Sequence, residues 1–208
     1  MTAPPAPALE FNEAAHAYTH GGRRLPSVTQ VLQAAGILRI PPGVPAVRLE
    51  YARQRGGAVH LAVELASLGT LDPQSLSASL EGYLFAYEAF CAKHMGDFTP
   101  EHVEVPLACP LLRLAGRPDQ IGRHRGVWDV LDVKAGAIVP PGTAVQTALY
   151  KLLARANGIP VVSRHGLHLK PDGTFQLHTY RDVADETEGR AALLVYHRRW
   201  AREKEMPI

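Results

Sequence analysis

Apolar and polar positions along this chain follow two periods, which divide it into helical and extended segments. Apolar residues at helical spacing predict helices, and alternating or short continuous apolar runs bounded by turn residues predict strands. The expected helices run from Ser27 or Thr29 to about Gly36 and over about 46–68, 76–93, 142–156 and 184–204. The expected strands span 11–19, 23–25, 101–107, 112–121, 127–134, 161–170 and 174–181. Helices therefore precede and follow a central group of strands.

Turn residues join neighbouring strands into three hairpins. Gly21-Gly22 closes the first, the polar Arg123-His124-Arg125 with Gly126 closes the second, and Pro171-Asp172-Gly173 closes the third. These residue types tolerate the backbone angles that tight turns require. In the second hairpin, we expect the preceding strand to end near 119–121 and to pair antiparallel with 127–134.

Length and composition favour one globular domain. The chain has 208 residues, 46% of them hydrophobic, which suits a single core of ordinary size. Residues 1–8 are rich in Pro and Ala, so we expect a disordered tail there and a single domain over 9–208. The chain contains no run of about 18 apolar residues, so we expect no membrane span.

Charge and cysteine content narrow the function classes. The net charge of +2 is only weakly basic, so a nucleic-acid surface would have to come from local clusters of Arg and Lys. Cys91 and Cys109 are the two cysteines, fewer than the four that an iron–sulfur cluster needs, so no such cluster is expected. Unpaired cysteines without a signal-peptide pattern predict a reducing, cytoplasmic location.

Two carboxylates and one lysine are expected to meet where two of these strands pair. The apolar run 127–131 predicts a buried strand, and side-chain alternation then places Asp132 and Lys134 on one face of it. Antiparallel pairing across the 123–126 turn brings Asp119 beside Asp132. Such a carboxylate pair is best explained by a hard divalent cation, Mg²⁺ or Mn²⁺. Lys134 cannot bind that cation, but it can orient an attacking water or stabilise developing negative charge.

These residues resemble the signature of a known family. Pro118-Asp119 followed by Asp132-Val133-Lys134 resembles the motif of the PD-(D/E)xK nuclease superfamily. Gly56 to His60 looks like the G-x-x-x-H element of its RecB-type branch, and Gln146 to Tyr150 looks like the Q-x-x-x-Y element of that branch. The N-terminal stretch 11–32 is similar to phage and mitochondrial genome-maintenance exonucleases, so the resemblance covers nearly the whole chain.

The resemblance implies a fold and a set of site residues. The implied fold is α/β and restriction-endonuclease-like, with a central mixed sheet flanked by helices and with N- and C-terminal hairpin extensions. The implied ligands of one or two Mg²⁺ or Mn²⁺ ions are His60, Asp119, Asp132 and the backbone carbonyl of Val133. Lys134 would be catalytic, and Gln146 and Tyr150 would position the scissile nucleotide. Further candidates are Glu104 and Glu64 near the metal, and Arg53 and Arg55 on DNA phosphates. His16, His165, His168 and His178 lie on expected hairpins without metal-ligand spacing.

The implied activity is metal-dependent hydrolysis of DNA phosphodiester bonds, from free or single-stranded ends. Two alternatives stay open: an endonuclease or a nuclease subunit of a recombination or repair complex, and a catalytically silent DNA-binding module. The intact set of Asp119, Asp132 and Lys134 argues against the silent module. A replication or recombination protein is a candidate partner. Polarity, the choice between DNA and RNA, and the oligomeric state are not readable from the sequence.

Overall fold

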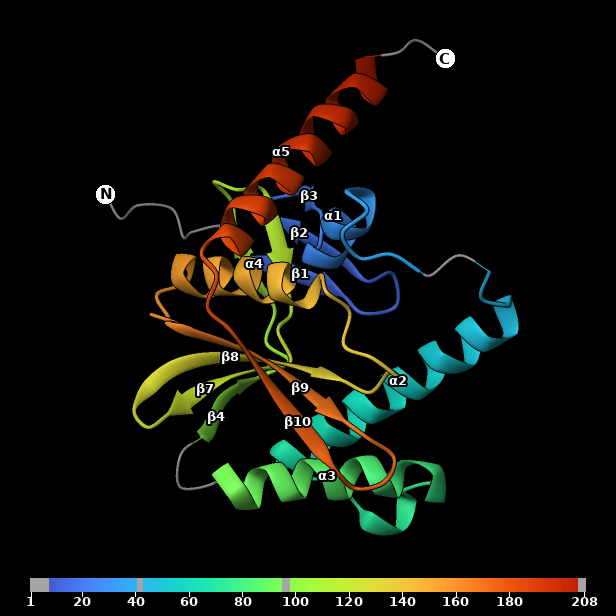
Figure 1. Ribbon diagram of the computed structural model, residues 1–208. Coiled ribbons are helices and arrows are strands. Elements are labelled where there is room, and N and C mark those ends of the chain that lie inside the picture. The colour runs from blue at the N-terminus through green and yellow to red at the C-terminus, as the bar shows by residue number, and fades with distance from the viewer. Residues whose placement is uncertain (1–7, 41–42, 95–97, 206–208) are drawn as a thin grey trace.

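A five-stranded mixed sheet forms the centre of the computed structural model, which describes residues 8–40, 43–94 and 98–205 (Figure 1). In spatial order, its strands are β10 (Phe175–Tyr180), β9 (Ser163–Leu169), β8 (Val127–Lys134), β7 (Gln120–His124) and β4 (Phe98–Val103). β8 and β9 run parallel, and the other neighbours run antiparallel. Apart from Ala8, the expected disordered tail lies outside the described residues.

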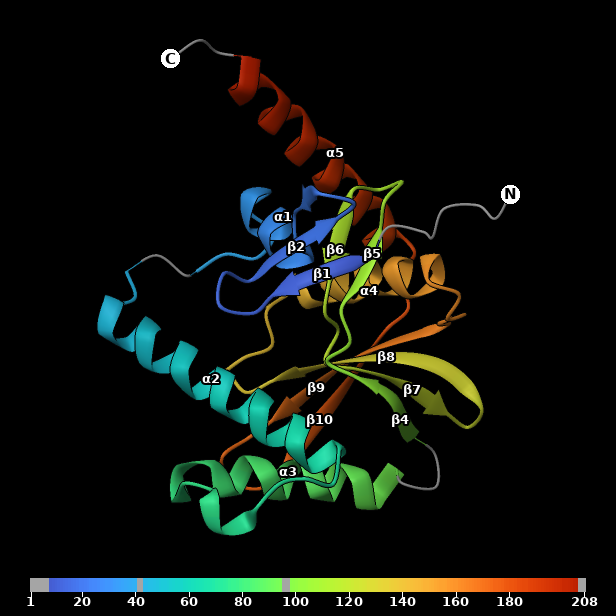
Figure 2. The same ribbon diagram turned by 180° about the vertical axis from the view of Figure 1, so that it is seen from behind.

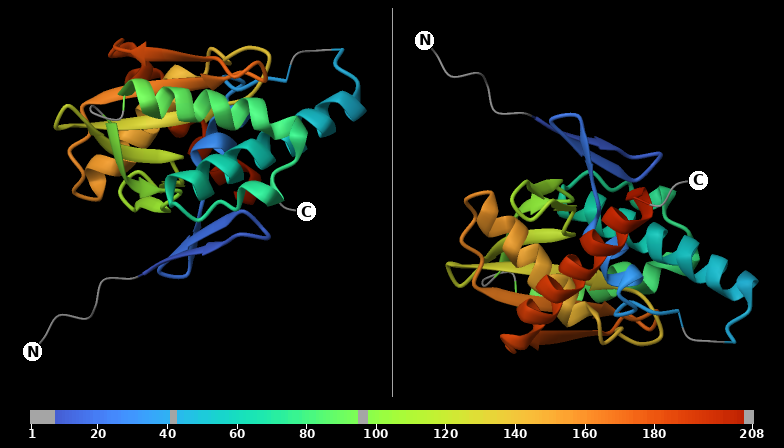
Figure 3. Two further views of the ribbon diagram at one scale, coloured as in Figure 1. Left: turned by 90° about the horizontal axis from the view of Figure 1, so that it is seen from below. Right: turned by 90° about the horizontal axis from the view of Figure 1, so that it is seen from above.

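Helices cover both faces of this sheet, as expected. α2 (Ala46–Ser67) and α3 (Ala78–His94) lie on one face, and α4 (Thr143–Ala156) and α5 (Ala184–Glu205) lie on the other side (Figures 2 and 3). The short 3₁₀-helix η1 (Pro73–Ser75) connects α2 to α3. None of the helices in the described ranges combines the length and apolar character that crossing a membrane requires.

Side-chain alternation along β8 divides the hydrophobic core between the two faces. Val130 packs with Leu149 and Leu153 of α4, whereas Leu131 and Val133 point to the face covered by α2 and α3. The continuous apolar character of β8 in the sequence reflects this burial on both sides. Fully burying each such side chain contributes about 1.5–3 kcal/mol relative to exposure, so β8 is anchored firmly at the centre of the sheet.

The N-terminal segment forms a separate three-stranded sheet, made of β1 (Leu9–Asn12), β2 (Ala17–His20) and β3 (Arg23–Leu25). The expectation of one strand over 11–19 is wrong, because a turn interrupts it. The side chain of Asn12 accepts a hydrogen bond from the backbone of Ala15, and His16 has a φ of 44°. α1 (Val28–Ala34) follows, and Ser27 caps it through a capping box with Gln30.

The expected strand over 112–121 is also two strands. β6 (Leu114–Gly116) pairs with β5 (Leu107–Cys109) in a two-stranded sheet of its own, and β7 belongs to the central sheet. Pro118 lies between them and has no N–H for a strand ladder. The β7–β8 turn is shorter than expected: Arg123 and His124 are part of β7, and only Arg125 (φ 53°) and Gly126 (φ 80°) form the turn. β7 thus begins, and does not end, near 119–121.

The C-terminal hairpin is part of the central sheet and not an addition to it. β9 follows α4 and pairs parallel to β8, with Asp132 opposite Gly166, so β8, α4 and β9 form a crossover unit. β10 then completes the edge of the sheet. The C-terminal hairpin therefore supplies two of the five strands that position the site.

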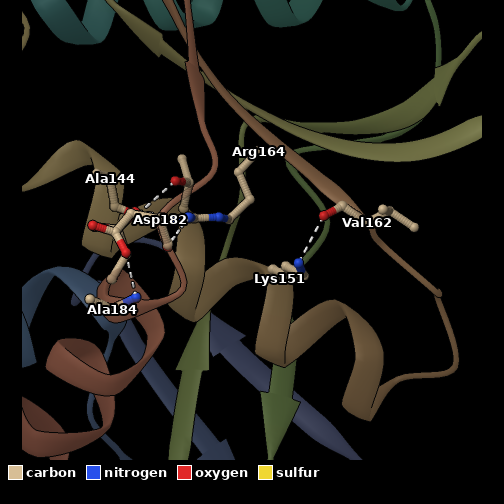
Figure 4. Close-up of polar contacts among 8 residues, drawn as sticks. Ala144, Lys151, Val162, Arg164, Asp182 and Ala184 are labelled. Carbon is tan, nitrogen blue, oxygen red and sulfur yellow. Dashed lines mark hydrogen bonds and ion pairs between the residues drawn. The ribbon is translucent and has the colours of Figure 1, made fainter.

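A buried arginine fastens this crossover. The guanidinium of Arg164 on β9 donates to the carbonyls of Ala144 (2.7 Å) and Asp182 (2.8 Å) (Figure 4). It also pairs with the carboxylate of Asp185 (2.8 Å). Only 6% of its side chain is exposed, so these partners are needed to offset the cost of burying the charge. The contacts tie β9 to the first turns of α4 and α5.

Candidate active site

A cavity of about 420 Å³ lies beside the C-terminal end of β8. Its lining includes the expected site residues His60, Glu64, Glu104, Asp119, Asp132, Lys134, Gln146 and Tyr150. These side chains come from two helices and three positions around the central sheet, far apart in the sequence. Arg53 and Arg55 do not line the cavity. The guanidinium of Arg53 pairs with Glu50 (3.1 Å), and that of Arg55 lies 5.7 Å from the centre of the Tyr51 ring.

Strand register places Asp119 beside Asp132. The β7–β8 pairing ends at Gln120 opposite Leu131, so the next residues beyond it are Asp119 and Asp132. One carboxylate oxygen of Asp119 accepts a hydrogen bond from the backbone N–H of Val133 at 2.5 Å. The other faces Nδ1 of His60 at 3.3 Å. The carboxylate is thus held in one orientation by β8 on one side and by α2 on the other.

Asp132 and Lys134 form an ion pair in the cavity wall. Their side chains are 1% and 18% exposed. Burial raises the pKa of Asp132 to about 6, opposed by the attraction of Lys134 and assisted by Asp119. Burial opposes the charged form of Lys134 as well, but the two aspartates outweigh it and raise its pKa. Lys134 therefore stays cationic at neutral pH inside a site that excludes most water.

His60 interacts electrostatically with the same charged side chains, Asp119, Asp132 and Lys134. The Asp119 carboxylate raises the pKa of His60 to about 9, in spite of the opposing effect of burial. The pKa of Asp119 is lowered, because His60, Lys134 and the Val133 N–H together outweigh the effect of burial. In the absence of a metal, the pair is therefore imidazolium and carboxylate at neutral pH. Binding of a cation at His60 requires release of that proton.

Glu104, an undecided candidate in the sequence, lies in the same cluster. Its backbone has a φ of 51°, the left-handed region that a residue other than glycine seldom adopts. Its N–H donates to the carbonyl of Asp119 at 3.0 Å, which accounts for this conformation. Its carboxylate, 9% exposed, pairs with Nε of Arg117 at 2.7 Å. Burial and then Asp119 raise the pKa of Glu104 to about 8.

Arg117 is a site residue that the sequence reasoning did not single out. It lines the cavity, pairs with Glu104, and faces Glu13 of the N-terminal segment at 3.4 Å. Its guanidinium also lies 5.2 Å from the centre of the Phe11 ring. In the sequence, only its position two residues before Asp119, in the stretch Gly116-Arg117-Pro118-Asp119, could have identified it as a site residue. Arg117 thereby links the acidic cluster to the N-terminal sheet.

Gln146 and Tyr150 form the opposite wall from α4. Gln146 donates from Nε2 to the Tyr150 hydroxyl at 3.3 Å. Burial, followed by the nearby Asp132 and Asp119, raises the pKa of Tyr150 well above its ordinary value, so the hydroxyl stays protonated. A Cβ at Gly116 would lie 2.9 Å from the Tyr150 ring, so only glycine allows this approach. Both side chains present donors to the cavity.

The donor set fits a hard divalent cation. His60, Glu104 and Asp119 can each offer one ligand atom, and these three atoms lie within 4.8 Å of one another. Carboxylate oxygens with one imidazole suit Mg²⁺ and Mn²⁺. Burial raises the pKa of Glu104 and of Asp132, so the nearby Arg117 and Lys134 offset only part of the cost of ionising these carboxylates. Glu64 lines the cavity outside this three-residue group.

Comparison with known proteins agrees with this geometry. The family model described as "PD-(D/E)XK nuclease superfamily" matches residues 75–167, which include Glu104, Asp119, Asp132, Lys134, Gln146 and Tyr150. Among solved structures, a protein of Eubacterium rectale described as a candidate exonuclease is similar, with a TM-score of 0.55 and 13% identity over 86% of this chain and 80% of its own.

A second structure, an alkaline exonuclease from Laribacter hongkongensis, matches with a TM-score of 0.42 and 13% identity over 85% of this chain and 93% of its own. A TM-score this low supports no conclusion. No curated protein sequence matches the chain. The family match thus rests on the motif-bearing core, and the Eubacterium rectale structure supports the fold. The part of the chain that the PD-(D/E)XK nuclease superfamily model matches thus carries the motif residues Asp119, Asp132 and Lys134, and these residues line one cavity.

Proposed function

We propose that the chain is a metal-dependent deoxyribonuclease of the RecB-type branch, which hydrolyses phosphodiester bonds from free or single-stranded ends and acts as a single domain over residues 9–208. The observation that carries the proposal is the meeting of His60, Glu104 and Asp119 with the Asp132–Lys134 pair in one cavity. Such a group of anions beside a fixed cation is expensive to bury unless a ligand offsets the negative charge.

The cation would be Mg²⁺ or Mn²⁺, and His60, Glu104, Asp119 and Asp132 would hold it, with the Val133 carbonyl as a further ligand. When bound, it supplies an activated water and stabilises charge on the phosphoryl oxygens. Lys134, kept cationic by its two aspartate neighbours, stabilises the charge that develops at phosphorus. The Tyr150 hydroxyl and the Gln146 amide donate hydrogen bonds that hold the scissile phosphate in place.

The surroundings of the site support the proposed preference for ends. Glu13, Tyr18 and Ser27 of the N-terminal segment line the cavity opposite Gly57, His60 and Leu61 of α2. A strand that enters between these walls is threaded, and a threaded strand needs an end. Arg53 and Arg55 lie one to two turns before His60 on α2. We propose that they contact phosphates outside the cavity, which makes binding weaken with salt and depend little on base sequence.

Digestion of matched DNA substrates tests this proposal. Circular single-stranded DNA should survive conditions under which the same molecule is degraded once linearised, with Mg²⁺ or Mn²⁺ present. EDTA should stop the reaction, and the Asp132→Asn variant should be inactive on every substrate. Equal loss of circular and linear DNA would favour an endonuclease, and DNA binding without any cleavage would favour a silent binding module. Full activity in excess chelator would reject the metal mechanism.

A further inference from the structure

A second cluster of potential metal ligands lies away from the nuclease cavity, on the face of the central sheet that α3 covers. His124 of β7, Asp129 of β8 and His165 of β9 can each offer a ligand atom, and these atoms lie within 4.8 Å of one another. Asp129 pairs with Gly122, and Leu131 pairs with His165, so all three side chains share the face of Leu131, which α3 covers. Asp132 and Lys134 alternate to the opposite face. The cluster is therefore distinct from the nuclease cavity.

The carboxylate of Asp129 is deeply buried between the two imidazoles. Its side chain is 2% exposed, and its Oδ2 lies 3.3 Å from Nδ1 of His124 and 3.3 Å from Nε2 of His165. Its Oδ1 has no hydrogen-bond partner among the described residues. A buried carboxylate normally receives several donors, because leaving its lone pairs unmatched is costly. The observed contacts therefore leave this anion under-compensated.

The separations match ligands around a metal better than direct hydrogen bonds. A charge-assisted hydrogen bond between a ring N–H and a carboxylate is about 2.7–2.9 Å long. Tetrahedral ligands placed about 2.0–2.1 Å from Zn²⁺ are about 3.3–3.4 Å apart. Both contacts of Asp129 have the latter spacing. Opposite Asp129, Gly122 carries no side chain, and the Phe98 ring and the β4 backbone pack over it.

The surroundings also suit a metal ligand set. Nδ1 of His165 lies 3.1 Å from the Thr179 hydroxyl, which can accept a hydrogen bond from an Nδ1–H; in that tautomer the Nε2 lone pair faces the cluster. His124, His165 and Thr179 also line a cavity of about 680 Å³ that opens between β9, β10 and α5. All three ligands line a separate small cavity of about 10 Å³ with Phe90, Phe98 and Leu131, which is close to the volume that one water needs.

We propose that His124, Asp129 and His165 bind Zn²⁺ at a second site, separate from the nuclease centre. Two imidazoles and one carboxylate suit Zn²⁺ and disfavour Mg²⁺, which prefers oxygen ligands and retains its waters. The ion joins β7, β8 and β9, the three adjacent strands at the centre of the sheet. Asp129 is three residues before Asp132, about 10 Å along the strand. Zn²⁺ therefore stabilises the sheet that positions the nuclease residues.

Metal titration of a protein whose nuclease site is disabled tests the proposal. In the His60→Ala/Asp119→Asn double variant, we expect one equivalent of Zn²⁺ per chain, and Co²⁺ in its place should give the intense visible bands of a tetrahedral ion. A Zn²⁺ concentration about 100-fold above the dissociation constant should raise the melting temperature by roughly 5–10 °C. Mg²⁺ should do neither.

Adding His124→Gln to this background should remove the bound equivalent and the thermal shift. His102→Gln on β4, which changes a histidine outside both ligand groups, is the matched control and should retain both. Absence of a bound equivalent in the double variant overturns the proposal, as does binding that survives His124→Gln. If His124→Gln does not fold, the Co²⁺ spectrum decides, since an octahedral spectrum or none contradicts a site of this geometry.

Discussion

Raising the pH of the metal-free protein from about 6.5 to 9 should lower its free energy of unfolding, because His60 then loses the proton that pairs it with Asp119. The pKa of His60 is about 9 in the folded protein, against an ordinary value of 6.5. A group with a raised pKa stabilises the fold fully below its unfolded value, and that contribution disappears as the pH passes the folded value. The loss should therefore fall between about pH 6.5 and 9.

The size of this loss in the free energy of unfolding can be worked out from the His60–Asp119 ion pair. A tenfold change in proton affinity corresponds to about 1.4 kcal/mol. The rise in the pKa of His60 from 6.5 to about 9 therefore corresponds to roughly 3 kcal/mol of folding stability. At the 3.3 Å separation of Nδ1 and the carboxylate, Coulomb's law with an effective dielectric of 20 gives about 5 kcal/mol before desolvation is subtracted. The two figures agree within their precision. Glu104, with a pKa of about 8, acts in the same direction above its ordinary value of 4.5.

Urea unfolding followed by circular dichroism at several pH values, in excess EDTA, measures this slope. His60→Gln should flatten the dependence between pH 6.5 and 9, and Glu104→Gln should reduce it mainly below pH 8. His20→Gln on β2, outside the cavity lining, is the matched control and should behave as the unaltered protein. Mg²⁺ or Mn²⁺ should restore stability most at high pH, where the cation no longer competes with protons.

A stability that is flat over this range in the unaltered protein would refute the charge assignment. So would an equal slope in His60→Gln, because the titrating group would then lie elsewhere. Metal stabilisation that is stronger at pH 6 than at pH 9 would contradict competition between the cation and the His60 proton.

Three further predictions concern cleavage and packing. Asp132→Asn should abolish cleavage while the protein stays folded, because it removes an anionic ligand and the repulsion with Asp119; circular dichroism and a digestion assay separate this from unfolding. Lys134→Ala should lower the rate by at least about 100-fold while metal binding is retained, as loss of a preorganised transition-state charge predicts, and a rate near that of the unaltered protein would exclude the role. Gly116→Ala should cost about 1–3 kcal/mol of stability and lower activity, since its Cβ would press on the Tyr150 ring at 2.9 Å; an unchanged urea midpoint and rate would show that α4 can shift freely.

The helices and the paired aspartates could be predicted because local chemistry decides them. α2, α4 and α5 begin and end within about two residues of the expected positions, since apolar periodicity and Pro and Gly breaks act within one element. Asp119 and Asp132 are joined by a hairpin with a two-residue turn, whose register follows from that turn. Their proximity therefore needed no long-range information.

Long-range pairing decided the features that the sequence left open or misplaced. Glu104 reaches the cluster because β4 pairs with β7, with a register shift between Pro100 and His102, and because its own backbone adopts a positive φ. The C-terminal hairpin enters the central sheet through the parallel pairing of β9 with β8 across α4. The break at Pro118 assigns β6 and β7 to different sheets, whereas the break at 13–16 leaves β1 and β2 as neighbours in one sheet. None of these outcomes follows from a local period.

The sequence alone therefore determined the helices, the apolar core strand and the acidic pair with its lysine, because periodicity, turns and short hairpins act between near neighbours. The tertiary structure alone decided which distant side chains join them. Arg117 beside Glu104, and His165 beside Asp129, come together through burial and strand order, with no fixed spacing along the chain. The physical reason is that a sheet selects partners by hydrogen-bond pairing and shared burial, and these are settled only when strands separated by many residues meet.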